Sequence, residues 1–114
     1  VATTYTGTLP CADCTGLDET LTLLPSVKNP RMGTYVMHDV YQGKEMKPFI
    51  TTGIWHITKG IPEDSQALML TLNANDPGMN VYFLMYGNDR LELLDNDKKK
   101  IDSPFDETLY RVKQ

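Results

Sequence analysis

The fold is decided by residues 68–86, which read LMLTLNANDPGMNVYFLMY. Leucine occupies every second position of residues 68–72, and residues 81–86 alternate in the same way between two sets of apolar and aromatic side chains. A repeat of two residues is typical of a β-strand, and aromatic and branched side chains favour strands. Asn75-Asp76-Pro77-Gly78 between the two runs is a turn sequence. The stretch therefore predicts two consecutive strands that pair antiparallel.

Turn signals recur along the rest of the chain and separate further runs of this kind. The run at residues 17–24 alternates similarly, with Glu19 interrupting its apolar side. We expect eight strands, at residues 3–9, 17–24, 33–42, 49–58, 66–73, 79–86, 90–95 and 107–112. Regular turns between short strands are typical of a barrel or a sandwich. We predict a single all-β domain over residues 1–114, a closed or nearly closed antiparallel eight-stranded barrel, with an open sandwich as the alternative.

The composition excludes several classes of protein. A net charge of −4 and an isoelectric point near 5.0 argue against a nucleic-acid-binding protein. No run of residues is long and apolar enough for a membrane-spanning helix. No signal peptide is recognisable, and Val1 is compatible with the start of a processed chain whose leader or anchor was removed.

Cys11-Ala12-Asp13-Cys14 is the one chemically distinctive motif, and it falls in the loop between the first two predicted strands. A structural zinc site needs four ligands, and no second pair of cysteines or histidines stands at zinc spacing. A thioredoxin-type redox pair needs a βαβ setting, which the predicted strands do not provide. Three interpretations stay open: two thiolates that bind Cu(I), a local disulfide in an oxidising compartment, or an idle pair.

Other metal-binding or catalytic groups are sparse. His38 and His56 each stand alone in a predicted strand. The six methionines form no M-x-M cluster, and those inside strands are expected to fill the core. No serine lies in a G-x-S-x-G nucleophile elbow, and there is no glycine-rich phosphate loop. We therefore predict no enzyme activity and no cofactor other than copper.

Residues 5–17, YTGTLPCADCTGL, form a specific string around the cysteine motif. Further strings follow in a fixed order: Gly33-Thr34-Tyr35, Tyr41-Gln42-Gly43, Gly53-Ile54-Trp55, Leu94-Asp95, Ile101 and Thr108-Leu109-Tyr110-Arg111. Taken together, these strings resemble the NlpE family of bacterial envelope lipoproteins, which are linked to copper resistance and to stress signalling. The resemblance covers nearly the whole chain.

The resemblance implies the fold of the family's N-terminal domain, a barrel similar in shape to bacterial lipocalins. It also implies an outer-membrane lipoprotein, anchored through a lipidated cysteine upstream of Val1 and facing the periplasm or the cell surface. Family members that activate the Cpx envelope-stress pathway carry a second, C-terminal domain, so the resemblance concerns their N-terminal domain. Where the family commonly has a glycine, this chain has Lys98, and we expect Asn96 and Asp97 to accommodate the turn.

Three functions are compatible with the residues and the resemblance. The first is a non-enzymatic domain for copper homeostasis or envelope-stress sensing, in which Cys11 and Cys14 coordinate Cu(I) when reduced or form a mutual disulfide when oxidised. Its expected partners are the outer membrane and an envelope stress-signalling protein, and not nucleic acid. The alternatives are a lipocalin-like carrier of a small hydrophobic ligand and a protein-interaction module with a structural disulfide.

Overall fold

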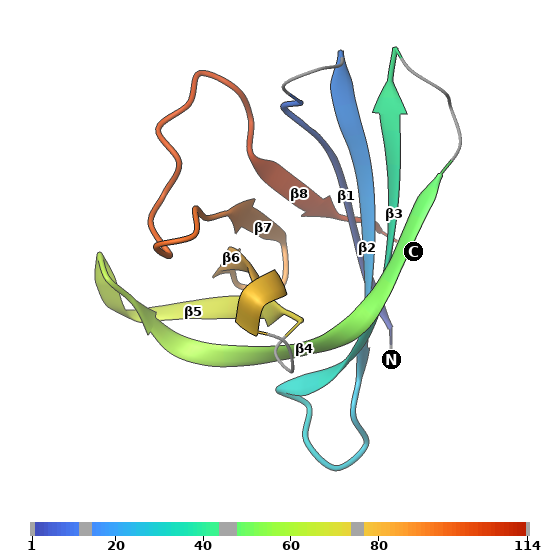
Figure 1. The fold of residues 1–114 in the computed structure, drawn as a ribbon. Coiled ribbons are helices and arrows are strands. Elements are labelled where there is room, and N and C mark those ends of the chain that lie inside the picture. The colour runs from blue at the N-terminus through green and yellow to red at the C-terminus, as the bar shows by residue number, and fades with distance from the viewer. Residues whose placement is uncertain (1, 12–14, 44–47, 74–76, 114) are drawn as a thin grey trace.

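The computed structural model describes residues 2–11, 15–43, 48–73 and 77–113. Its strands are β1 (Thr3–Leu9), β2 (Gly16–Pro25), β3 (Met32–Gln42), β4 (Phe49–Ile61), β5 (Asp64–Leu72), β6 (Val81–Tyr86), β7 (Arg90–Leu93) and β8 (Thr108–Arg111). Each strand pairs antiparallel with the next, and β1 pairs with β8 (Figure 1). The predicted closed eight-stranded barrel is therefore confirmed. In the described ranges, no helix has the length and apolar character that crossing a membrane requires.

Only β1 has the predicted ends, and each of the other seven strands begins or ends one to three residues away from its predicted position. Two of these shifts have a physical cause in the backbone. β4 runs on to Ile61 instead of ending at residue 58, because Gly60, with a φ of +101°, lies where the register with β5 shifts and forms a bulge. β6 begins at Val81 instead of residue 79, because Pro77–Met79 form a 3₁₀ turn, η1. Both differences come from backbone geometry that alternation of side chains does not reveal.

Side chains fill the centre of the barrel. Alternate residues of the strands point inward and form one cluster of buried residues: Tyr5, Leu9, Leu21, Leu23, Tyr35, Trp55, Leu70, Leu72, Phe83, Leu91 and Leu109. Met37 and Met85 pack against this cluster, as expected for methionines inside strands. An eight-stranded barrel has an interior of the size that side chains can fill, and here the middle of the barrel is occupied in that way.

Gly53 makes room for an aromatic ring in this core. It lies opposite Tyr35 across β3 and β4, and a Cβ atom on Gly53 would come within 2.9 Å of the Tyr35 ring. The Tyr35 hydroxyl donates a hydrogen bond of 2.5 Å to Asn73 Oδ1, and the Trp55 indole donates one of 2.8 Å to the Thr34 carbonyl. The string Gly53-Ile54-Trp55 thus serves the packing of two large buried rings.

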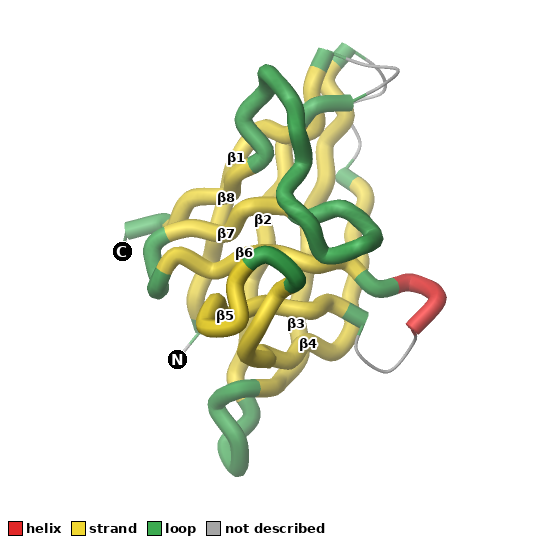
Figure 2. The backbone as a smooth tube through the Cα atoms, turned by 90° about the vertical axis from the view of Figure 1, so that its left-hand side faces the viewer, coloured by secondary structure: helices red, strands yellow, loops and turns green. Residues whose placement is uncertain are grey.

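A second, smaller cluster lies on the other face of β5 and β6. The long connection between β7 and β8, residues 94–107, is one of the green loops in Figure 2. Its first residue, Leu94, packs with Met69 and Leu84. Lys98 in this connection has a φ of +64°, and its ammonium group lies 5.3 Å from the centre of the Tyr82 ring. Asn96 and Asp97 lie in the turn, which is closed by a hydrogen bond of 3.0 Å from the Lys98 amide to the Asp95 carbonyl, but the left-handed conformation is taken by Lys98 itself.

Candidate functional site at the cysteine end of the barrel

The cysteine motif lies in the connection between β1 and β2, at one end of the barrel (Figure 1). Cys11 is half-buried. Cys14 lies outside the described residues, so the use of the pair as Cu(I) ligands or as a mutual disulfide stays a prediction. Elsewhere in the described parts of the chain, no three His, Cys, Asp or Glu side chains are close enough together to hold a metal ion.

Asp18 ties together the three strands at the base of this loop. Its carboxylate accepts a hydrogen bond of 2.7 Å from the Thr8 hydroxyl of β1 and two of 2.9 Å from the Gln42 amide of β3. These hydrogen bonds, from Gln42 first and Thr8 second, lower the pKa of Asp18. The charged carboxylate is thus the form that holds the base of the loop.

The backbone on either side of this base is also fixed. The Thr15 amide donates a hydrogen bond of 3.2 Å to the Gln42 carbonyl. Gly43 follows with a φ of +80°, and a Cβ atom there would come within 2.9 Å of the Thr15 hydroxyl. The strings around Cys11 and around Gln42, which lie far apart in the sequence, therefore meet in space.

Two buried carboxyl groups face each other just below this base. Glu19 of β2 and Asp39 of β3 are direct cross-strand neighbours, and they are 5 % and 7 % exposed. Burial, followed by the hydrogen bond to Asp39 and the charge of Asp39, raises the pKa of Glu19 to about 8. Burial also raises the pKa of Asp39, while the hydrogen bond from Glu19 and the charge of His38 lower it. Glu19 is therefore the protonated partner, and it donates to the carboxylate of Asp39.

The sequence contained one signal for this pair. Glu19 interrupts the apolar side of residues 17–24, which a strand in a barrel turns toward the core. Nothing in the sequence gave the register that places Asp39 opposite it. The sequence prediction for this region therefore contained the cysteines and missed the two carboxyl groups.

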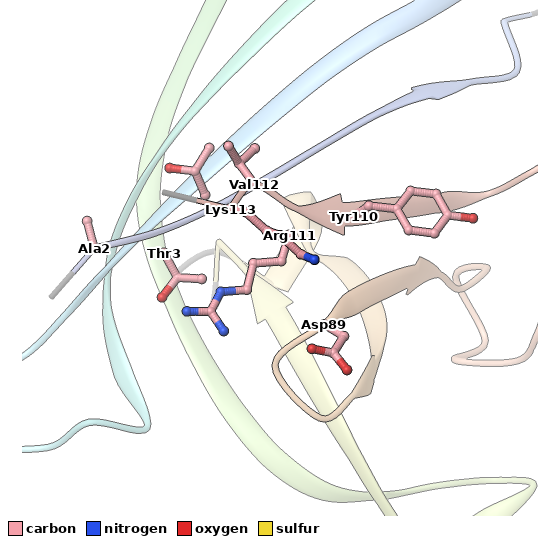
Figure 3. A pocket seen from close by; sticks show the side chains of 8 residues that line it. Ala2, Thr3, Asp89, Tyr110, Arg111, Val112 and Lys113 are labelled. Atoms are coloured by element: carbon pink, nitrogen blue, oxygen red, sulfur yellow. The ribbon is translucent and has the colours of Figure 1, made fainter.

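A cavity of about 700 Å³ lies at the other end of the barrel, where the chain begins and ends. It is lined by the first residues of β1, the turn between β6 and β7, and the end of β8: Ala2, Thr3, Thr4, Asp89, Tyr110, Arg111, Val112 and Lys113. The Arg111 side chain extends toward Thr3, whereas the Tyr110 ring points away in the opposite direction (Figure 3). The Tyr110 hydroxyl instead donates a hydrogen bond of 2.8 Å to Asp106.

Comparison with known proteins agrees with this fold. The family described as the NlpE N-terminal domain matches residues 5–104. The lipoprotein NlpE of Escherichia coli (strain K12) is 35 % identical over 107 residues, which are 92 % of this chain and 39 % of that protein. The crystal structure of NlpE from Escherichia coli, described as a Cpx pathway activator, matches with a TM-score of 0.56 and 27 % identity, covering 98 % of this chain and 52 % of the other. The chain thus spans about half or less of these relatives. It belongs to the NlpE N-terminal domain family.

Proposed function

We propose that this chain is the N-terminal barrel of an envelope lipoprotein that takes part in a Cpx-type stress response, and that it has no enzymatic role. Family membership supports this proposal, as does the similarity to NlpE of Escherichia coli, which is described both as a lipoprotein and as a Cpx pathway activator. The expected anchor is the outer membrane, with the barrel facing the periplasm or the cell surface. The expected partner is an envelope stress-signalling protein.

The cysteine loop is the proposed sensing element. The observation that carries this is the fixed base of the loop, where the carboxylate of Asp18 joins Thr8 and Gln42. A change in the chemistry of Cys11 and Cys14 acts on a short loop whose two ends are held by the ordered strands β1 and β2. Reduced thiolates select the soft ion Cu(I), and oxidation replaces that site by a disulfide.

A competition titration tests the copper role. The reduced domain and a Cys11→Ser/Cys14→Ser variant are titrated with Cu(I) in the presence of a strong chelator. We expect the wild type to withdraw one Cu(I) from the chelator and the double variant to withdraw none. A Met32→Leu/Met79→Leu variant, which removes two exposed thioethers, is the matched control and should behave like the wild type. Equal copper uptake by the wild type and the double cysteine variant would exclude the copper role.

A thiol count separates the copper site from a permanent structural disulfide. The domain is prepared without reductant, unfolded and titrated with a thiol reagent. Two free thiols per chain support the metal site, and none supports the disulfide as the resting state. The thiol count and the copper titration use the same preparation, which is reduced only before the copper titration.

The carrier function is the second candidate, and the cavity at the opposite end of the barrel favours it. Because side chains fill the middle of the barrel, the cavity at that end is the proposed ligand site. Native mass spectrometry of the domain purified from its host would detect a bound lipid as an added mass. An Arg111→Ala variant should lose that mass, whereas the cysteine double variant should keep it.

A further inference from the structure

Glu19 and Asp39 are an unusual feature of the barrel wall, because carboxyl groups are seldom buried without a cation. Both groups are more than nine-tenths buried, and they are bonded to each other. Asp39 Oδ1 has no hydrogen-bond partner among the described residues. Within the described part of the chain, Asp39 Oδ1 therefore lacks a donor that would stabilise a second negative charge on the pair.

The surroundings of the pair add little positive charge. On β1 the residue opposite Glu19 is Gly7, and on β4 the residue opposite Asp39 is Phe49, so neither neighbouring strand contributes a charge there. On β3, His38 is the one titratable neighbour whose charge acts on Asp39. Because His38 is exposed on the other face of the strand, water screens its charge.

Two other carboxylates nearby belong to different networks. Asp18, which precedes Glu19 on β2, is bound on the outer face by Thr8 and Gln42. Glu107, ahead of β8, is also buried, and its pKa is raised first by burial and then by the charges of Asp106 and Glu92. The proton equilibrium at Glu19 is thus governed by burial and by Asp39.

The position of the pair links it to the cysteine loop. Glu19 lies three residues after Gly16, where the loop enters β2, and Asp39 lies three residues before Gln42, which binds Asp18. A change in the distance between β2 and β3 at Glu19 and Asp39 would therefore also move the residues at the base of the loop.

We propose that Glu19 and Asp39 are a proton-sharing pair that couples the pH of the surroundings to the order of the cysteine end of the barrel. With one proton between them, the pair carries a single negative charge and a hydrogen bond that joins β2 to β3. When the proton passes to water, two carboxylates face each other with no donor between them, and repulsion loosens the strands beside the loop. The proposal is independent of copper binding and of stress signalling.

Amide hydrogen exchange across pH tests this coupling. Protection factors, corrected for the intrinsic pH dependence of exchange, are compared at pH 6 and pH 9 for residues 16–20 and 38–42, with the far ends of the same strands as the internal reference. In the wild type we expect protection near the loop to fall about tenfold or more relative to that reference. In Glu19→Gln, whose amide keeps a donor toward Asp39 but cannot ionise, the ratio should stay constant. Asp102→Asn, at an exposed carboxylate, is the control and should follow the wild type.

Carbon NMR of the side-chain carboxyls keeps the test independent of how well Glu19→Gln folds. In the wild type, Glu19 should titrate well above the range of an ordinary glutamate, and Asp39→Asn should bring its midpoint down. An ordinary midpoint for Glu19, or equal exchange profiles in the wild type and Glu19→Gln, would overturn the proposal. The Cys11→Ser/Cys14→Ser variant should retain the pH response, so a failure of the copper role and a failure of the proton pair are distinguishable.

Discussion

Asp18 and Glu19 are consecutive carboxylates with opposite behaviour, because strand alternation sends them to opposite sides of β2. Asp18 meets two donors at the surface, and its pKa falls. Glu19 enters the barrel wall, and its pKa rises. The alternation of side chains is readable from the sequence. The donors to Asp18 and the partner of Glu19 lie on β1 and β3, and only the register of these strands shows which residues they are.

The raised pKa of Glu19 should make the domain less stable as the pH rises. Its pKa rises from 4.5 to about 8 on folding, so the folded state holds a proton that the unfolded chain has lost between those values. The contribution of Glu19 to the free energy of unfolding is therefore fully present below about pH 4.5 and declines as the pH rises to about 8. Urea unfolding at pH 5 and pH 8 should show a loss of a few kcal/mol in the wild type and a much smaller loss in Glu19→Gln. Equal losses in both proteins would contradict this assignment.

Asp18 should respond in the opposite direction. Its lowered pKa means that its stabilising contribution is present above 3.8 and is lost as the pH falls below that value. Gln42→Leu removes the larger of the two causes, so the pKa of Asp18 should move up toward its ordinary value in a carbon NMR titration. Gln66→Leu, on an exposed part of β5, is the control and should leave Asp18 unchanged. An unchanged Asp18 in Gln42→Leu would show that Thr8 alone holds it.

The elements themselves were largely predictable. All eight strands lie where alternation and turn residues indicated, and β1 has the predicted ends, residues 3–9. The bulge at Gly60 and the 3₁₀ turn at Pro77–Met79 were not predictable from the sequence, since both depend on backbone angles. The packing of the 94–107 connection was not predictable either, because Leu94 covers an apolar surface that Met69 and Leu84 form on the outer face of β5 and β6.

Lys98 offers a test within that connection. A side chain at a φ of +64° costs about 1 kcal/mol relative to glycine, which is partly offset by the contact of its ammonium group with Tyr82. Lys98→Gly should therefore raise the free energy of unfolding by about 0.5 kcal/mol. Lys99→Gly, at a neighbouring position without a positive φ, should lower it or leave it unchanged. A loss of stability in Lys98→Gly would mean that the contact with Tyr82 outweighs the backbone strain.

In the whole molecule, the strands close into a barrel and side chains fill its interior. The sequence predicted the closed barrel from eight short strands separated by turn residues, but not whether the interior holds side chains or a ligand. The answer depends on the sizes of residues that meet from different strands, such as Tyr35 against Gly53. Such pairs become readable only once the register is known.

A substitution in the centre tests how completely it is filled. Leu109 is fully buried between β1 and β7, and Leu109→Ala should lower the free energy of unfolding by about 3 kcal/mol. Val112→Ala, at a residue that is 39 % exposed, should cost no more than about 0.5 kcal/mol. Urea unfolding measures both. A cost below about 1 kcal/mol at Leu109 would indicate a loosely filled interior and would favour the carrier function.

The barrel closes through a short ladder, and this has a mechanical consequence. β1 and β8 share two residue pairs, whereas β2 and β3 share ten. Because β1 and β8 are antiparallel, Ala2 and Lys113 lie at the same end of the barrel and line one cavity. A force that draws the two ends of the domain apart would load this seam as a zipper, one hydrogen-bonded pair after another, and not in shear across the whole ladder. The barrel should therefore open first along β1, which is the strand that leads into the cysteine loop.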